Sequence, residues 1–375
     1  MRAPPERREA SDGRAAGELD RAPSFLLKCP RDRARAKGLW HVSVKIACFE
    51  RLDEVARDAA GALDRAARPI LYDRLDWFRL LEAHCPPAGR LLALRADAEG
   101  APSWLVLAIE GRTARPYAAW YSLRVGPIGG SGADAMTSFA ETLAARRLAS
   151  LVMAPMERPE PLAEGLAKAG WWVRVEPDKA NWRIATEGMD FEAYWASRSG
   201  RLRNTVRRKA RAAALDVMIH RRFDAEAWAD YESVYRASWK PEEGSFPFLR
   251  ALAEQEGAAG CLRLGVAKKD GRPVAAQLWT VENGEATIHK LAYAEDAKAL
   301  SPGSILSQAM FRHVLDEDRV AAIDYGVGDE PYKAEWMAER RQLWRIVAHN
   351  PRTFPGLLRG LRERASALAA RLRTR

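Results

Sequence analysis

Apolar and polar positions alternate along the chain with two spacings, that of a strand and that of a helix. Together they predict a protein of mixed strands and helices. Val42, Val44 and Ile46 alternate with other residues as in a half-buried strand, and residues 91–95 and 104–110 are further strand candidates. Residues 135–149 carry apolar positions at helical spacing, and the short run 151–153 is typical of a buried strand. Before residue 39 the chain is polar and rich in Arg and Ala. We expect residues 1–38 to be a disordered basic leader or an over-extended start.

The same order of elements recurs further along the chain, which indicates an internal duplication. Gly100–Pro102, between two strand candidates, is matched by Gly271–Pro273 after 171 positions, and Ala119–Tyr121 is matched by Leu291–Tyr293 after 172. Two more matches have offsets of 170 and 171 positions. We interpret them as a repeated unit of strand, turn, strand, strand, helix, strand, helix, strand. The alternative is that two α/β stretches share Gly-Pro turns by chance.

This interpretation gives an α+β (α/β) fold class, with two mixed sheets flanked by helices. Residues 39–185 would form the first copy, residues 186–350 the second, and residues 351–375 a basic amphipathic tail. The copies differ in polarity. Asp324, Tyr332, Lys333 and Trp336 of the second copy correspond to Met153, Leu162, Ala163 and Leu166 of the first. The second copy is therefore expected to carry the reaction, with the first as support and substrate wall.

Charge narrows the choice of partners. The two tails account for the whole formal net charge of +10, so a uniformly basic coat for nucleic acid is excluded and DNA is not an expected partner. One local stretch, residues 198–222, holds nine Lys/Arg against the single acid Asp216. Arg203, Arg207 and Arg211 form a row at i, i+4 spacing on a predicted helix, which suits phosphates or acidic glycans but is also typical of a solvated face. The four cysteines have no paired spacing, so neither disulfides nor a metal site is expected.

Three segments of the second copy are candidates for chemistry. Residues 322–333 place an acid and a phenol, Asp324 and Tyr325, at the end of a buried strand, with glycines and then a helix start behind them. Residues 301–304 predict a helix whose N-terminal N–H groups favour an anion such as a pyrophosphate, although a plain helix start looks the same, and the glycine-rich stretch 126–132 competes for this role. His289 and Lys290 lie on a predicted strand, where neighbours point to opposite faces. One of them would then face the cleft.

From about residue 45 to 350 the chain resembles the FemAB-like, CelD/BcsL-type branch of the GNAT acyltransferases, which is linked to cellulose and exopolysaccharide assembly. The resemblance rests on the following segments: Phe191–Tyr194 with the basic helix after it, Ala237–Lys240, Gly271–Gln277, His289–Tyr293, Ser301–Gly303 and Asp324–Lys333. It implies a tandem GNAT fold that transfers an acyl group from acetyl-CoA or a longer acyl-CoA to an amine or hydroxyl of a small-molecule or saccharide acceptor. The usual GNAT pyrophosphate signature is reduced to Ser301–Gly303.

Within this reading each candidate has an expected role. Asp324 or His289 would be the base and Tyr325 or Tyr332 the acid, while backbone N–H groups near Gln277 would polarise the carbonyl. The cofactor would lie on Ser301, Pro302, Gly303 and Ser304. Substrate contacts are expected from Trp239, Lys240, Lys290, Asp329, Lys333, Trp336, Arg203 and Arg207. The resemblance also implies a cytoplasmic protein that contacts the inner membrane or a polysaccharide synthase peripherally. Two alternatives stay open: a FemX-like transferase that uses aminoacyl-tRNA, and a non-catalytic binding subunit of a synthase complex.

Overall fold

A computed structural model describes residues 25–26, 44–97, 102–130 and 132–373. Most of the predicted leader lies outside these residues, apart from the two-residue strand β1 (Phe25–Leu26). The first half of the chain contains β2 (Lys45–Phe49), α1 (Leu52–Ala59), the short turn η1 (Leu71–Asp73), α2 (Leu75–His84), β3 (Arg90–Asp97), β4 (Ser103–Glu110), β5 (Thr113–Pro116), β6 (Ile128–Gly129), α3 (Ala133–Ala145), β7 (Ser150–Met156), α4 (Glu160–Lys168) and β8 (Trp172–Ala185).

The second half repeats the predicted order of elements. It contains α5 (Phe191–Ala196), α6 (Gly200–Ala213), β9 (Asp216–His220), α7 (Ala225–Arg236), α8 (Phe246–Ala258), β10 (Leu262–Lys269), β11 (Arg272–Glu282), β12 (Glu285–Tyr293), η2 (Glu295–Leu300), α9 (Pro302–Arg312) with a π turn at His313–Glu317, β13 (Ala322–Val327), α10 (Lys333–Trp336), β14 (Glu339–His349) and α11 (Phe354–Arg373). The run β3-β4-β5-α3-β7-α4-β8 thus corresponds to β10-β11-β12-α9-β13-α10-β14.

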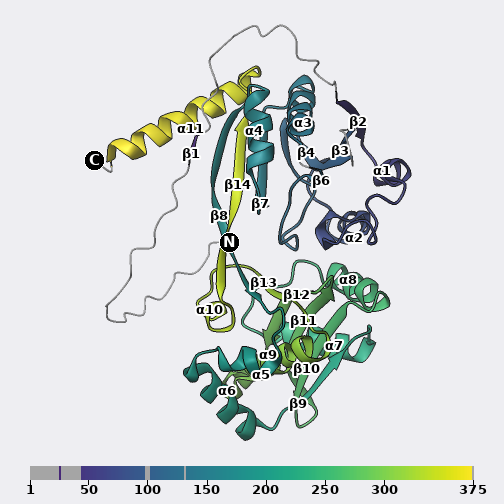
Figure 1. Cartoon of the computed structure of the whole chain (residues 1–375), viewed down its shortest axis with the longest axis vertical. Helices are drawn as coiled ribbons and strands as arrows, with labels where there is room; N and C mark the ends of the chain where they lie inside the picture. Colours follow the sequence, from purple (N-terminus) through teal and green to yellow (C-terminus); the bar gives the residue numbers. More distant parts are fainter. Residues whose placement is uncertain (1–24, 27–43, 98–101, 131, 374–375) are drawn as a thin grey trace, which may run out of the picture.

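The strands form one sheet, not the two that the repeat predicts. Its order is β2-β3-β4-β5-β7-β14-β8-β13-β12-β11-β10-β9, with β1 and β6 off this path. The last strand of each half crosses to the other half: β14 pairs with β7, and β8 pairs with β13. The two crossing strands also pair with each other, from Glu339–Arg183 to His349–Trp172, and run side by side between the two halves in Figure 1. The exchange therefore fuses two sheets into one.

Three main groups of buried side chains surround this sheet. One lies under α3 and α4 in the first half, and a second under α5, α6 and α9 in the second. The third joins the halves, because α1 and α2 of the first pack together with α7 and α8 of the second. At this junction the Phe248 ring stacks on Tyr121 at 4.5 Å and meets Trp77 edge-on at 5.3 Å between ring centroids. The junction is hence a hydrophobic core and not a loose contact.

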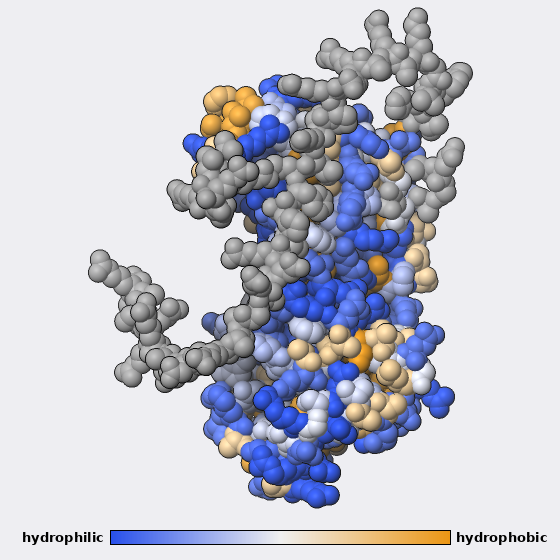
Figure 2. Space-filling model, turned by 60° about the vertical axis from the view of Figure 1, so that its left-hand side comes forward, coloured by the Kyte–Doolittle hydropathy of each residue, from blue (hydrophilic) through white to orange (hydrophobic). Residues whose placement is uncertain are grey.

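The C-terminal segment forms the predicted helix, and its first half packs on the sheet. Arg359 donates to Thr113 and Ser150 at 3.0 Å, and the Arg364 guanidinium lies 3.8 Å from the Trp172 ring centroid. Within the described residues, no helix combines the length and the hydrophobicity that crossing a bilayer requires. The face shown in Figure 2 is largely hydrophilic, with its apolar residues in small patches.

The close contact between α3 and α4 gives a stability prediction. A Cβ on Gly165 would lie 2.6 Å from the Met136 carbonyl carbon, so the two helices must move apart to admit it. We expect Gly165→Ala to lower the free energy of unfolding by about 1–3 kcal/mol, measured by urea denaturation. Gly200→Ala in α6 is the matched control, since a Cβ there meets nothing within 4 Å. Equal stability of the two variants would contradict the packing described.

Candidate functional site

The parallel strands β12 and β13 separate after a short ladder, and this separation is where the site begins. Their pairing runs from Glu285–Ala322 to Thr287–Asp324 and stops there. β12 nevertheless continues to Tyr293 and β13 to Val327, where β13 pairs with β8 instead. In the first half β5 and β7 separate in the same way, after Ala114–Leu151. Each half thus has an opening between two diverging parallel strands.

A β-bulge interrupts β12 at His289. On the neighbouring strand, Leu278 pairs with Lys290 and Trp279 pairs with Ile288, so His289 is the extra residue. A bulge leaves its extra residue outside the ladder and redirects side chains, and bulges are frequent beside active sites. Here it sends His289 and Lys290 to the same face, the one that meets the first half. The expectation that these neighbours point to opposite faces was wrong, because strict alternation fails at a bulge.

A cavity of about 220 Å³ lies between the halves on this face. Both halves contribute to its wall: the first half supplies a loop before α2 and the segment after β5, and the second supplies strands β11, β12 and β13. Its polar lining consists of Tyr72, Arg124, Glu157, Asn181, Thr280, Glu282, Asn283, Glu285, Thr287, His289 and Asp324. The cavity therefore brings together His289 and Asp324, the two residues predicted to act as the base.

Asp324 is held in a fixed position by hydrogen bonds. Its Oδ1 accepts from the Asn181 amide and from the Gly326 backbone N–H, each at 2.7 Å. Arg341 approaches its other oxygen at 3.5 Å and donates to Asn181 Oδ1 at 2.6 Å. These contacts fix the direction in which the carboxylate faces the cavity. Asp324 is consequently suited to orient a donor group of a substrate by charge and hydrogen bonding.

His289 is neutral at physiological pH. Burial and the positive charge of neighbouring Lys290 lower the pKa of His289 to about 4. One ring nitrogen, Nε2, lies 2.9 Å from Thr280 Oγ1, which fixes the orientation of the imidazole. A neutral, oriented imidazole on a cavity wall can exchange hydrogen bonds with a ligand, while its low pKa makes it a weak base at neutral pH.

The buried hydroxyl of Tyr72 also lines the cavity and has no hydrogen-bond partner among the described residues. Other buried polar atoms of the described residues also lack a partner, but this hydroxyl faces a cavity. Burial raises the pKa of Tyr72 well above its usual range, so the hydroxyl stays protonated. Tyr72 and Arg124 were not expected from the sequence, since the first half was interpreted as support. The unpartnered hydroxyl is a ready donor for a ligand in the cavity.

Lys290 is not a free anchor. Its ammonium lies 2.8 Å from Glu243, 4.2 Å from the Trp120 ring centroid and 4.9 Å from that of Tyr121. Tyr121 in turn donates to Glu243 Oε1 at 2.7 Å. This cluster fastens residues 120–121 of the first half over the β12 bulge, so Lys290 has a structural task.

The segment after β13 is arranged differently from the helix predicted there. Helix α10 is only four residues long, and Trp336 is buried against Phe311 and Trp195. Tyr332 is 40% exposed, so the two do not line one pocket. Lys333 is buried and donates to the Val327 carbonyl at 2.8 Å, next to Glu330.

The two tyrosines and Asp329 of this segment are also engaged. Burial raises the pKa of Tyr325 and of Tyr332 well above the usual value for tyrosine, which makes both poor proton donors. Asp329 pairs with Arg340, which lowers the pKa of that carboxyl. Trp239 is exposed, in the loop between α7 and α8.

The start of α9 has the properties of an anion site. Ser301 occupies the predicted cap position and Pro302 the first helical position, but the Ser301 side chain makes no capping bond. The N–H groups of Gly303 and Ser304 therefore have no partner among the described residues, and the helix dipole favours negative charge there. Lys209 of α6 donates to the Ala299 carbonyl at 2.6 Å, which places the basic helix beside this end.

The basic helix keeps its arginines on the outside. Leu202, Val206 and Ala213 are buried, whereas Arg203 and Arg207 are exposed. Gln277 does not offer the free backbone N–H group that polarising a carbonyl would require. Its backbone is paired on both sides, and its buried side chain donates to Ser307 of α9 at 2.8 Å. On the neighbouring strand β12, His289 is the residue that lies outside the ladder between β11 and β12.

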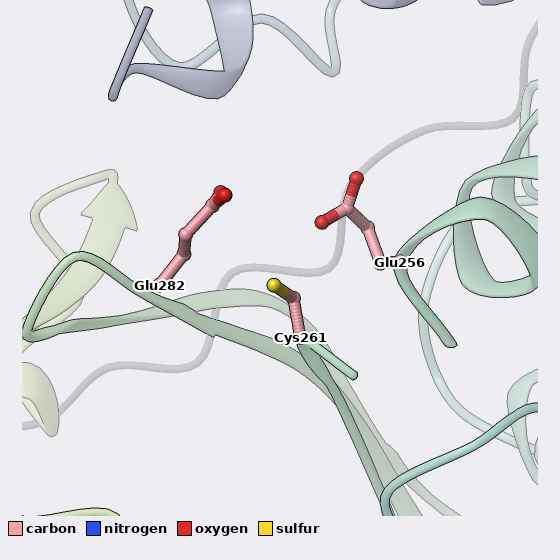
Figure 3. A group of neighbouring side chains, drawn as sticks. All are labelled: Glu256, Cys261 and Glu282. Carbon is pink, nitrogen blue, oxygen red and sulfur yellow. The ribbon is translucent and has the colours of Figure 1, made fainter. Parts of the chain in front are cut away.

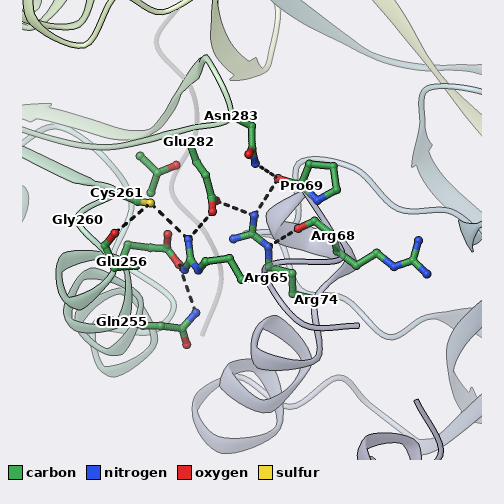
Figure 4. Close-up of polar contacts among 12 residues, drawn as sticks. Arg65, Arg68, Pro69, Arg74, Gln255, Glu256, Gly260, Cys261, Glu282 and Asn283 are labelled. Atoms are coloured by element: carbon green, nitrogen blue, oxygen red, sulfur yellow. Dashed lines mark hydrogen bonds and ion pairs between the residues drawn. The ribbon is translucent and has the colours of Figure 1, made fainter. Parts of the chain in front are cut away.

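Glu256, Cys261 and Glu282 converge in the way a metal ion would require (Figure 3). Figure 4 shows what lies among them: the Arg65 guanidinium, 2.5 Å from Glu256, 2.8 Å from Glu282 and 3.4 Å from the Cys261 sulfur. Arg74, which is almost completely buried, reaches the other oxygen of Glu282 at 2.6 Å. We call Arg65, Arg74, Glu256 and Glu282 the clamp. It fastens the loop before α2, and with it Tyr72, to the second half.

Comparison with known proteins agrees with this architecture. Residues 196–334 match the family model "Acetyltransferase (GNAT) domain". This GNAT segment contains the strand opening, the bulge and α9. No curated protein matches the chain in sequence.

Two solved structures share the fold over most of the chain. The C-terminal domain of a putative lysylphosphatidylglycerol synthetase from Agrobacterium fabrum is 15% identical, with a TM-score of 0.54 over 85% of this chain and 97% of that one. FemX is 9% identical, with a TM-score of 0.53 over 80% of this chain and 96% of that one. Together with the family model they confirm the predicted α+β (α/β) fold class with a GNAT domain, although the strands form one large mixed sheet and not two.

The neutral state of His289 predicts a pH dependence of stability. In an unfolded chain His289 takes up a proton near pH 6.5, but in the folded protein only near pH 4, so the unfolded state binds more protons in between. Stability should therefore decline as the pH falls from 6.5 to 4. We expect His289→Gln to decline less steeply over this window, measured by urea denaturation at a series of pH values. Parallel curves for the two proteins would refute the neutral, buried imidazole.

Proposed function

We propose that this protein is a GNAT-type acyltransferase that transfers an acyl group from acyl-CoA to an amine or hydroxyl acceptor. The observation that carries the proposal is the position of a polar cavity with His289 and Asp324 on one side of the β12–β13 opening, within a segment that matches a GNAT domain. The free N–H groups of α9 and the basic helix α6 supply a place for the donor's phosphates.

The proposed chemistry assigns each group one task. The acceptor occupies the cavity, where Asp324 and the Tyr72 hydroxyl orient it. Asp324 or His289 takes the proton from the attacking nitrogen or oxygen, directly or through water. The acyl carbonyl lies at the β12 bulge, where backbone outside the ladder is available to polarise it. Arg203 and Arg207 contact donor phosphates from the outer face of α6.

The nature of the cavity suggests a class of acceptor. Four carboxylates line it, those of Glu157, Glu282, Glu285 and Asp324, and each pairs with at least one arginine. Carboxylate oxygens that remain open to the cavity accept hydrogen bonds, which suits a molecule with hydroxyl or amino groups. Such groups occur in saccharides, so the proposal includes an acceptor from the cell envelope or an exopolysaccharide, as in the CelD/BcsL-type proteins that the sequence resembles.

An aminoacyl-tRNA donor is the second candidate, and the exposed arginines of α6 are the observation that favours it. FemX and the lysylphosphatidylglycerol synthetase domain share the fold, but at 9% and 15% identity they do not decide the donor. The two donors differ in how much phosphate backbone they present, so the salt dependence of binding separates them.

Loss of Asp324 should abolish most of the activity. We expect Asp324→Asn to lower turnover by about 100-fold or more while the far-ultraviolet circular dichroism stays that of the wild type, because the substrate loses its charged partner. The measurement is transfer from radiolabelled acetyl-CoA to a panel of amines and amino sugars. Asp296→Asn, an exposed acid outside the cavity, should retain wild-type rates. Full activity of Asp324→Asn would remove this residue from the mechanism.

Replacing Arg203, Arg207 and Arg211 together by Ser should weaken donor binding about 10-fold or more and flatten its salt dependence. The measurement is calorimetric titration with coenzyme A and, separately, with tRNA at several salt concentrations. For coenzyme A the wild-type dependence should be shallow, and for tRNA steep. Arg79→Ser on α2 serves as the control. Unchanged affinity for both ligands in the triple variant would contradict a donor role for α6.

A further inference from the structure

Helix α11 packs on the sheet through its glycines. A Cβ on Gly360 would overlap the Trp172 ring, and a Cβ on Gly356 would lie 2.7 Å from the Ala149 carbonyl oxygen. The backbone of the helix therefore lies directly against residues next to β7 and at the start of β8, and this face has no room for a larger side chain. In helices of soluble proteins the face toward the core normally carries the large apolar residues.

The large apolar side chains of α11 lie on the opposite side and face solvent. Phe354 is 78% exposed, Leu358 39% and Leu361 50%. Their i, i+4 and i+7 spacing places them in one row along the helix, which we call the apolar row. Among the large hydrophobic residues that the structure describes, Phe354 has the highest exposed fraction. Contiguous apolar groups in solvent indicate a surface that binds a partner or a membrane.

Exposed arginines flank the apolar row. Arg352 and Arg362 belong to the same C-terminal segment. Arg112 and Arg147 lie beside the start of the helix, because the Ala149 N–H donates to the Arg112 carbonyl at 2.8 Å and the Arg112 side chain donates to the Arg147 carbonyl at 3.1 Å. None of these four guanidinium groups pairs with an acid among the described residues, so their charge is available to a partner.

The single acid of residues 351–375, Glu363, does not offset this charge. Its carboxylate lies 3.5 Å from Arg174 and 3.2 Å from His349, so it is engaged with the sheet. Seven arginines stand against it in this segment. The surface around the apolar row is therefore both hydrophobic and positive. Two copies of this face would bring like charges together, so its charge disfavours a dimer and favours an anionic partner.

We propose that α11 is a membrane-binding helix that lies in the surface of an anionic lipid bilayer, with the apolar row among the acyl chains and the flanking arginines at the lipid phosphates. Helices that bind in the plane of a bilayer combine Phe or Leu on one face with Arg or Lys beside it. Figure 1 shows that the C-terminal half of α11 extends beyond the sheet, which leaves it accessible to a flat surface. The glycine face meanwhile keeps the helix docked on the protein. The inference does not depend on the proposed acyl transfer.

Vesicle binding of the full-length protein tests the proposal. The vesicles consist of phosphatidylcholine alone or of equal parts of phosphatidylcholine and phosphatidylglycerol, and the partition coefficient is measured by sedimentation at several salt concentrations. We expect the wild type to bind the anionic vesicles, more weakly as salt increases, and not the neutral ones. The triple variant Phe354→Ser, Leu358→Ser, Leu361→Ser should lower the partition coefficient about 10-fold or more, because the inserted apolar groups are lost.

The flanking charge is tested in the same way. Arg352→Gln combined with Arg362→Gln should lower the partition coefficient about 5-fold per arginine and flatten its salt dependence. Met189→Ser combined with Met218→Ser removes two exposed apolar side chains outside α11, so this matched control should bind as the wild type does. Hydrogen exchange of the wild type gives a second readout that needs no variant: anionic vesicles should slow exchange in residues 354–364 and leave the basic helix α6 unchanged.

Several results would overturn the proposal. Absence of wild-type binding to anionic vesicles, or equal binding to both kinds of vesicle, would remove the anionic bilayer as the partner. Full binding by the triple serine variant, or protection of α6 in place of α11, would show that the contact lies elsewhere on the protein. A wild-type dimer that the serine variant converts to a monomer, measured by analytical ultracentrifugation, would show instead that the apolar row is an interface between copies of this chain.

Discussion

The exchange of β8 and β14 is the constraint on which the rest of the structure depends. Each strand leaves its own half and completes the sheet of the other, and together they form the longest ladder between the halves. Buried backbone groups must keep their hydrogen-bond partners, so the halves cannot separate without breaking this ladder. The exchange holds the loop before α2 and the segment after β5 over the second half. The cavity wall can therefore be shared between residues far apart in the chain, such as Tyr72 and Asp324.

The two openings between diverging strands have the same architecture but different chemistry. In the first half, Met153, Leu162 and Leu166 are completely buried in the core under α3 and α4. In the second half, Asp324 at the equivalent strand reaches the cavity and accepts three hydrogen bonds or ion pairs from its surroundings. The first copy uses these positions for core packing, whereas the second copy keeps a polar side chain at the equivalent strand. This difference explains why the cavity that holds Asp324 lies beside the parallel strands of the second half.

The sequence predicted the order of elements and the helices α6 and α9, because periodicity and internal repeats can be recognised without knowing which strands are neighbours. It also named Asp324 and His289 as alternative candidates for the base, and both line the cavity. The strand exchange could not be predicted from the sequence, since alternation tells which face of a sheet a residue occupies but not which strand is the neighbour. The bulge at His289 shifts the period by one residue, so the common direction of His289 and Lys290 could not be read from alternation. Tyr72 had no motif to mark it. Trp336 and Lys333 are residue types that often contact substrates. In the structure, Trp336 is buried in the core and Lys333 donates to the Val327 carbonyl.

The shared sheet also separates two notions of a domain in this chain. Residues 196–334 match one family model, but β13 within them pairs with β8, which precedes this segment, and β14 follows it. A fragment trimmed to the matched region would present an unpaired strand edge to solvent, with its aggregation hazard, and would lack the loop that the clamp fastens. The segment that matches the family model and the unit able to fold alone are thus of different size. In this architecture the boundaries of a sequence match do not mark the boundaries of an independent folding unit.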